Sequence, residues 1–209
     1  MLSGLLAHWK MNEESGSRAD SSGHGHTLTD NNSVGYAVGK LGNAAEFVFS
    51  SSQTLVNAGL PMTGLPAASF SGWFKSTGSR DLSCALTLGA ASDDFCGIQI
   101  YPKANGGHLY MTVATIGANY DYTVGEWLHI AVSMGGGLYK VFLNGELAAS
   151  GEGIPNFNTD GVIFGNDNEN RYNEGLVDSV SVWNRALSDE DVAALYNSGD
   201  GLDYESFTL

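Results

Sequence analysis

Residues 175–199 read Gly175-Leu-Val-Asp-Ser-Val-Ser-Val-Trp-Asn-Arg-Ala-Leu-Ser188-Asp-Glu-Asp-Val-Ala-Ala-Leu-Tyr-Asn-Ser-Gly199. The first half alternates in polarity, which is typical of a strand with one buried face. The second half begins with Ser188 as an N-cap residue, continues with an acidic first turn, and has Gly199 as its stop, so it predicts a short helix. The stretch therefore predicts a long closing strand and a helix whose apolar side packs on a sheet edge or rim.

The same two-residue period recurs along the rest of the chain, most clearly at Leu128, Ile130, Val132 and Met134. Further apolar rows lie at Leu5/Ala7/Trp9/Met11, Ala45/Phe47/Phe49, Phe70/Gly72/Phe74, Ile98/Ile100 and Leu109/Met111/Val113. The Asn-Gly pair at residues 144–145 predicts a hairpin with a type I′ turn, because both residues accept positive φ. Each apolar row needs a partner sheet, so the chain is predicted to be all-β.

Composition limits the number of domains and the kinds of partner. The 209 residues, 43% of them hydrophobic, suit one β-sandwich domain over residues 1–209. A formal net charge of -14 argues against nucleic acid and anionic membranes as partners. No apolar stretch approaches the roughly 20 residues that span a bilayer. The opening residues show no signal peptide, so we expect either that an export signal was trimmed or that the protein leaves the cell another way, for example in a virion.

Four segments in order carry a family resemblance. They are residues 6–13 with 20–25, residues 42–47 with 70–75, residues 125–132 with the hairpin at 144–145, and residues 175–188 with the helix that follows. Together they resemble the laminin-G-like jelly-roll domain of the concanavalin A-like lectin/glucanase superfamily. Two positions depart from the family pattern, Val48 where an acidic residue is frequent and Trp183 where tyrosine is common. Neither departure affects the expected fold.

The resemblance implies a two-sheet antiparallel β-sandwich (jelly roll, concanavalin A-like) with one short C-terminal helix. It also implies an extracellular or virion-associated, non-catalytic recognition module, glycan-binding or adhesive. The expected partner is a glycan or a cell-surface or virion protein. A structural capsid or tail decoration protein without glycan binding is the alternative.

A calcium ion is the predicted cofactor. Strict alternation gives Asp178 the parity of Val180 and Val182, and an inward carboxylate is costly unless it meets a cation or several donors. A glycine-rich loop that begins at Asp20 can add a carboxylate and carbonyl oxygens, the ligands calcium prefers, and the family resemblance implies a similar ion. The predicted donors are Asp20, Gly23, His24 and Asp178. The alternative is that Asp178 accepts backbone hydrogen bonds and Asp20 closes an Asx-turn.

Ligand-binding residues are predicted in two polar, aromatic loops. Sugars have a polar edge and an apolar face, so aromatic rings, amides, carboxylates and arginine suit them. These residues are Tyr120, Tyr122, Asp167, Asn168, Asn170, Arg171 and Tyr172. Solvated turns are the alternative. A row of Trp73, Tyr101 and Tyr110 lines either an open sheet face or a surface under a loop.

The other reactive side chains in the sequence do not form a motif that indicates an enzyme. No strand carries the paired carboxylates of retaining or inverting glycosidases, and no Gly-x-Ser-x-Gly elbow is present. A glycoside hydrolase or polysaccharide lyase is the less favoured alternative. His24 and His26 lack further zinc ligands nearby in sequence, and His129 suits packing better than base catalysis. Cys84 and Cys96 flank a possible hairpin, and either a cross-strand disulfide or two free thiols fits the sequence.

Overall fold

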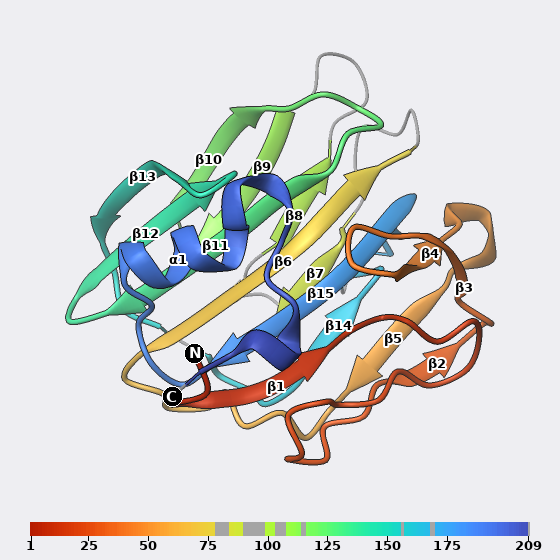
Figure 1. The fold of residues 1–209 in the computed structure, drawn as a ribbon, viewed down its shortest axis with the longest axis horizontal. Coiled ribbons are helices and arrows are strands. Elements are labelled where there is room, and N and C mark those ends of the chain that lie inside the picture. The colour runs from red at the N-terminus through yellow and green to blue at the C-terminus, as the bar shows by residue number, and fades with distance from the viewer. Residues whose placement is uncertain are drawn as a thin grey trace.

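The larger of two facing antiparallel sheets has eight strands in this computed structural model (Figure 1). The structure describes residues 1–77, 84–89, 99–102, 108–113, 116–155, 157–167 and 170–208, with backbone only for 99–102, 108–113 and 116–120. The large sheet runs in the order β13-β12-β11-β6-β15-β4-β3, and β1 also pairs with β15. Its strands are β1 (Leu5–Trp9), β3 (Gly35–Val38), β4 (Asn43–Phe47), β6 (Ala68–Ser76), β11 (Leu128–Gly135), β12 (Leu138–Leu143), β13 (Glu146–Glu152) and β15 (Gly175–Trp183).

A four-stranded sheet lies against the inner face of the large one, in the order β2-β5-β14-β7. Its strands are β2 (Thr29–Asn31), β5 (Thr54–Asn57), β7 (Leu86–Leu88) and β14 (Val162–Phe164). A third ladder joins β8 (Gln99–Pro102), β9 (His108–Val113) and β10 (Ile116–Asp121). Among the described residues the only α-helix is α1 (Asp189–Tyr196), and short 3₁₀ turns are η1 (Phe49–Ser51), η2 (Asn197–Gly199) and η3 (Tyr204–Ser206). The predicted two-sheet jelly-roll sandwich is confirmed.

The apolar rows meet between the two sheets. The predicted row on β11 faces inward, with Ile130 opposite Gly72 and Val132 opposite Phe70 on β6. Trp9 is fully buried in the same core, and its ring meets Phe164 of the small sheet edge-on at 5.5 Å. The hairpin at Asn144 and Gly145 has positive φ at both residues, as predicted.

A bulge in β15 corrects the parity expected for its residues. Asp178 pairs with Trp73 and Ser181 pairs with Ser71, so three steps on β15 match two on β6. Ser179, inside the bulge, has φ of 47°. Asp178 therefore does not share a face with Val180 and Val182: it lies on the outer face of the large sheet.

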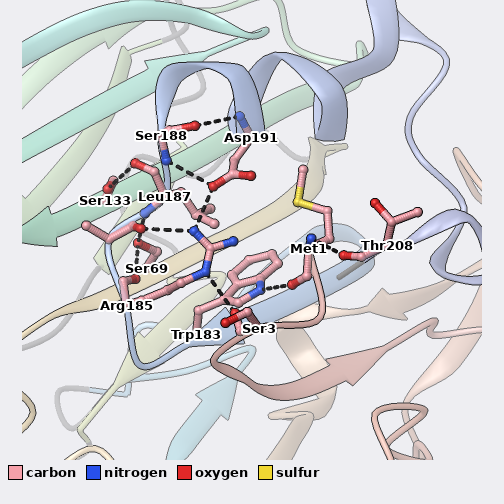
Figure 2. A network of polar contacts seen from close by, with 11 residues as sticks. Met1, Ser3, Ser69, Ser133, Trp183, Arg185, Leu187, Ser188, Asp191 and Thr208 are labelled. Carbon is pink, nitrogen blue, oxygen red and sulfur yellow. Dashed lines mark hydrogen bonds and ion pairs between the residues drawn. The ribbon is translucent and has the colours of Figure 1, made fainter.

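The C-terminal segment covers that outer face and forms a second core (Figure 1). This core comprises Leu5, Ala131, Phe142, Trp183, Leu187, Val192, Leu195 and Phe207. Hydroxyl groups of the sheet bind the chain that leads into α1 (Figure 2). The Ser69 hydroxyl donates to the carbonyl of Arg185 and accepts from the amide of Leu187, while Ser133 donates to the Leu187 carbonyl.

The helix begins as predicted but ends earlier. Ser188 Oγ accepts a 3.1 Å hydrogen bond from the Asp191 amide, and the Asp191 carboxylate accepts from the Ser188 amide and from Arg185 (Figure 2). The helix ends at Tyr196, because Asn197 takes the left-handed conformation before Gly199 is reached.

Replacement of the N-cap serine tests how strongly this closure is held. We expect Ser188→Ala to lower the free energy of unfolding by about 1 kcal/mol, because the Asp191 amide loses its acceptor. Urea unfolding measures the loss. Ser150→Ala, at an exposed position on β13, is the control and should stay within about 0.5 kcal/mol of wild type. Equal losses in both variants would contradict the capping role.

Candidate functional site

Asp178 is a buried anchor for the turn between β3 and β4. Its Oδ2 accepts hydrogen bonds from the amides of Lys40 at 2.6 Å and Leu41 at 2.8 Å. A Cβ at Gly39 would lie 2.5 Å from the same oxygen, so the turn needs glycine there. Burial raises the pKa of Asp178 to about 7, although the neighbouring backbone amides favour its charged form.

Asp20 holds a different loop. Its Oδ1 accepts from the amides of His8 at 3.1 Å and Ser22 at 2.9 Å, and its Oδ2 accepts from the His26 amide at 3.0 Å. Burial alone would raise the pKa of Asp20, but hydrogen bonds from Ser22, His8 and His26 outweigh it and lower the pKa. The contact with Ser22 is the Asx-turn of the alternative interpretation.

Asp20 and Asp178 bind the backbone of separate segments. The amide and carbonyl of His8 both face away from β15, toward Asp20 and Ser21, so Asp20 lies along the free edge of β1. Gly23 has positive φ, and the His24 ring contacts Ser22 and the Leu6 carbonyl. Within the described part of the chain no three His, Cys, Asp or Glu side chains cluster as metal ligands. The two carboxylates thus serve backbone amides, and calcium stays a prediction.

A buried ion pair fixes the loop after β14. Arg171 Nε lies 2.5 Å from Asp167 Oδ2, and the Asp167 side chain is fully buried. The Arg171 carbonyl accepts from the Cys84 amide at 2.8 Å, which ties the loop to the segment before β7. The charge-assisted pair therefore joins Asp167 at the end of one described segment to Arg171 in the next.

Two predicted tyrosines flank the end of β6. Tyr172 is half-buried with its ring edge-on to Phe49 at 6.3 Å, and Asn170 beside it is exposed with φ of 59°. Tyr122 is half-buried against the main core, and burial raises its pKa. The backbone of residues 76–77 bonds to Gly125 and Glu174, so the loops of both tyrosines start from the same end of the sheet. Asn168 and the side chain of Tyr120 lie outside the described residues.

Trp73 does not line an open sheet face. It is only 3% exposed, because Tyr196 stacks on it at 5.8 Å and the Lys40 ammonium lies 4.9 Å from its ring centroid. His129 is buried beside it, donates to or accepts from Ser71 Oγ at 2.8 Å, and has its pKa lowered to about 3 by burial. Trp73 and His129 thus pack beneath the C-terminal segment. The side chains of Tyr101 and Tyr110 are not among those described.

A cavity that the sequence did not predict opens on the same outer face. Its volume is about 200 Å³. It is lined by His8, Lys10, Asn12, Leu41, Ser179, Asp203, Tyr204 and Glu205. The outward polar row of His8, Lys10 and Asn12 in the first strand was the available signal, but nothing in the sequence places residues 203–205 across from it.

Cys84 precedes β7 in the chain. It is fully buried beside Thr87, and burial raises its pKa to about 12. Cys96 lies outside the described residues, so the predicted alternatives for this pair stay open.

Comparisons with known proteins identify relatives of this fold. A laminin-G-type model of the concanavalin A-like lectin/glucanases superfamily matches residues 41–193. No curated protein sequence gives a significant match. No helix among the described residues has the length and apolar character needed to cross a membrane.

Three solved structures share the fold at low sequence identity. Domain 4 of AbnA, a GH43 extracellular arabinanase from Geobacillus stearothermophilus, has a TM-score of 0.73 at 21% identity, over 90% of this chain and 96% of that one. The binding domain of Paraclostridial Mosquitocidal Protein 1 has a TM-score of 0.72 at 17% identity, over 94% of this chain and 52% of that one. Trypanosoma rangeli sialidase has a TM-score of 0.74 at 13% identity, over 96% of this chain and 34% of that one. The chain thus spans about half of the toxin domain and about a third of the sialidase.

Acidification changes the stability of the folded state in two opposite directions through groups on the outer sheet face. The raised pKa of Asp178, about 7 against an ordinary 3.8, means that its protonation favours the folded state as the pH falls between these values. Burial lowers the pKa of His8 to about 4 and that of His129 to about 3, from 6.5. Both histidines therefore stabilise the folded state above pH 6.5, and this stability is lost as the pH falls below that value.

Replacement of the Asp178 carboxyl group removes the contribution that favours the folded state as the pH falls. We compare the free energy of unfolding of Asp178→Asn with that of wild type. This difference should favour the variant at about pH 8 by more than about 1 kcal/mol relative to its value at about pH 4, because asparagine carries no buried charge. Urea unfolding at both pH values measures the difference. Glu14→Gln, at an exposed site, should show a constant difference. If the difference between Asp178→Asn and wild type is the same at both pH values, the raised pKa of Asp178 is contradicted.

Proposed function

Because the chain belongs to the concanavalin A-like lectin/glucanases superfamily, we propose that it is a non-catalytic recognition module that binds glycans. The observation that carries the proposal is the ion pair of the fully buried Asp167 side chain with Arg171, beside which lie the half-buried Tyr172 and the exposed Asn170. Loops on a rigid sandwich vary without disturbing the core, which is why recognition often resides there.

The chemistry of these side chains suits a sugar. The half-exposed Tyr172 ring can stack on the apolar face of a sugar, and the exposed Asn170 amide can bond its hydroxyl groups. Two fold relatives bind ligands of this class: the arabinanase domain is in complex with arabinotriose, and botulinum neurotoxin type C interacts with two ganglioside molecules. Those ligands belong to those proteins, and for this chain they support the class only.

Absence of catalysis is part of the proposal, because fold relatives include chains of enzymes. Glycosidases hold two carboxyl groups about 5–10 Å apart across a substrate site. The buried carboxylates Asp167 and Asp178 and the half-buried Asp20 instead bind backbone amides or an arginine. They therefore serve the fold, and the chain is proposed to bind without cleaving.

The proposed setting is the outside of a cell or the surface of a virion, where a glycan or a surface protein would be the partner. Binding domains with this fold include one of botulinum neurotoxin DC in complex with rat synaptotagmin II, so a protein partner is the second candidate. A decoration protein of a capsid or tail that binds no glycan is the third.

Calcium is the cofactor proposed from the sequence, and its site is a separate test. An ion shared by Asp20 and Asp178 must compete with the amides that occupy their oxygens. If it binds, calcium at a hundredfold excess over Kd should stabilise the fold by about 2.7 kcal/mol. Thermal unfolding with calcium or with EDTA measures this, and Asp20→Asn should abolish the increase. A Tm that does not respond to calcium would remove the ion from the proposal.

A glycan array tests recognition itself. We expect the intact protein to bind a subset of glycans, and Tyr172→Ala to weaken that binding because a stacked ring is lost, by about 1 kcal/mol or more. Tyr172→Phe, which keeps the ring, is the matched control. Tyr122→Ala is unsuitable because this side chain packs against the main core. An array without binding would favour the decoration protein, and release of reducing ends from a polysaccharide would contradict the absence of catalysis.

A further inference from the structure

We propose that the cavity between β1 and η3 binds a single neutral sugar residue, an inference that rests on the glycan recognition proposed above. The cavity lies on the outer face of the large sheet, between residues 8–12 on one side and residues 203–205 on the other. Its volume of about 200 Å³ is below the roughly 300 Å³ at which pockets for drug-sized ligands begin. A ligand of the size of one sugar ring therefore fits it better than a longer chain.

The walls combine an aromatic ring with polar groups of several kinds. Tyr204 supplies the ring, Asn12 an amide and Ser179 a hydroxyl group, while Asp203 and Glu205 add carboxylates. Sugar hydroxyl groups both donate and accept, so they match a wall of this mixed type, whereas an apolar ligand would leave these groups without partners.

Part of this wall is held in place before any ligand arrives. The Tyr204 ring stacks on His8 at 4.6 Å, and His8 Nδ1 lies 2.6 Å from Ser181 Oγ. The Asn12 side-chain oxygen accepts from the Asn43 amide at 2.7 Å. Groups that are already ordered lose little conformational entropy on binding.

His8 also leaves polar capacity at the cavity. It is 1% exposed, and its Nε2 has no hydrogen-bond partner among the described groups. A buried polar atom without a partner lowers the stability of the fold. This nitrogen is enclosed, so a bound hydroxyl group would satisfy it after a small shift of the wall.

The charges select a neutral ligand. The Lys10 ammonium pairs with Glu205 and lies 5.9 Å from the centroid of the Tyr204 ring, so the position that a ligand cation would prefer is already filled. The carboxyl groups of Asp203 and Glu205 contact each other, and they would repel the carboxylate of a uronic or sialic acid. The formal net charge of -14 adds to that repulsion at long range.

Titration of the ¹⁵N-labelled protein with single sugars tests the site. The probes are the methyl glycosides of glucose, galactose, mannose, xylose and arabinose, with glucuronate and sialate as acidic counterparts. We expect at least one neutral glycoside to shift the amides of Lys10, Ser179 and Tyr204, and the acidic sugars to leave them unchanged.

Two matched aspartate variants separate the cavity from its surroundings. Asp203→Ala removes a carboxylate of the wall and should weaken the neutral sugar about tenfold, as expected for a hydrogen bond to a charged group. Asp200→Ala removes an exposed aspartate outside the cavity and should leave the affinity unchanged.

The outcomes distinguish this inference from the function on which it rests. Shifts confined to residues 170–174 and 121–122 would keep glycan recognition and overturn the cavity site. Tighter binding of glucuronate or sialate in the cavity would overturn the choice of a neutral sugar. Equal weakening of sugar binding by both aspartate variants would overturn the cavity site. If no sugar shifts any amide and the glycan array shows no binding, both proposals are overturned.

Discussion

The extra residue in β15 is the constraint on which the other features of this sandwich depend. β15 pairs with β6 along most of its length and with β4 and β1 on its other side. Before the bulge Val177 faces the main core, and after it Val180 and Val182 do so. A strand without the bulge would have to bury Asp178 or expose the later valines, since side chains alternate strictly along a regular strand.

The bulge also explains why the outer face can hold a second core. It turns Trp183 outward, where its indole donates to the Met1 carbonyl at 2.8 Å (Figure 2). The Trp183 ring stacks near Phe207 on the same face. The two chain ends therefore meet on this face, and the Met1 amino group bonds to the Thr208 carbonyl. Asp178, turned the same way, holds the turn at Lys40 and Leu41 instead of entering the main core.

Much of the fold was predictable because it follows from local periodicity. The inward row on β11, the hairpin at Asn144 and the N-cap at Ser188 all depend on neighbours close in sequence. The bulge was not predictable, because Ser179 gives no sign of a positive φ and the extra residue is defined only by pairing with β6. That is why Asp178 was assigned to the wrong face.

The candidate sites were less predictable than the fold, because they depend on contacts between distant segments. The loop of Asp167 and Tyr172 was identified from its composition, but the ion pair within it and its bond to Cys84 required the structure. Burial of Trp73 depends on Tyr196, more than a hundred residues away in the sequence. The cavity depends in the same way on residues 203–205 lying across from β1.

The two buried histidines of the outer face show which end of it a ligand can reach. Each ring bonds to one serine hydroxyl, His8 to Ser181 and His129 to Ser71, and each leaves its other nitrogen without a partner among the described groups. His129 is sealed beneath Trp73 and Tyr196, so its cost to stability cannot be relieved by binding. His8 lines the cavity, so a shift of the cavity wall would let a polar ligand offset the same kind of cost there. The proposed recognition site on this face therefore lies beside β1, where His8 is next to the cavity, and not beneath the helix, where Tyr196 covers His129.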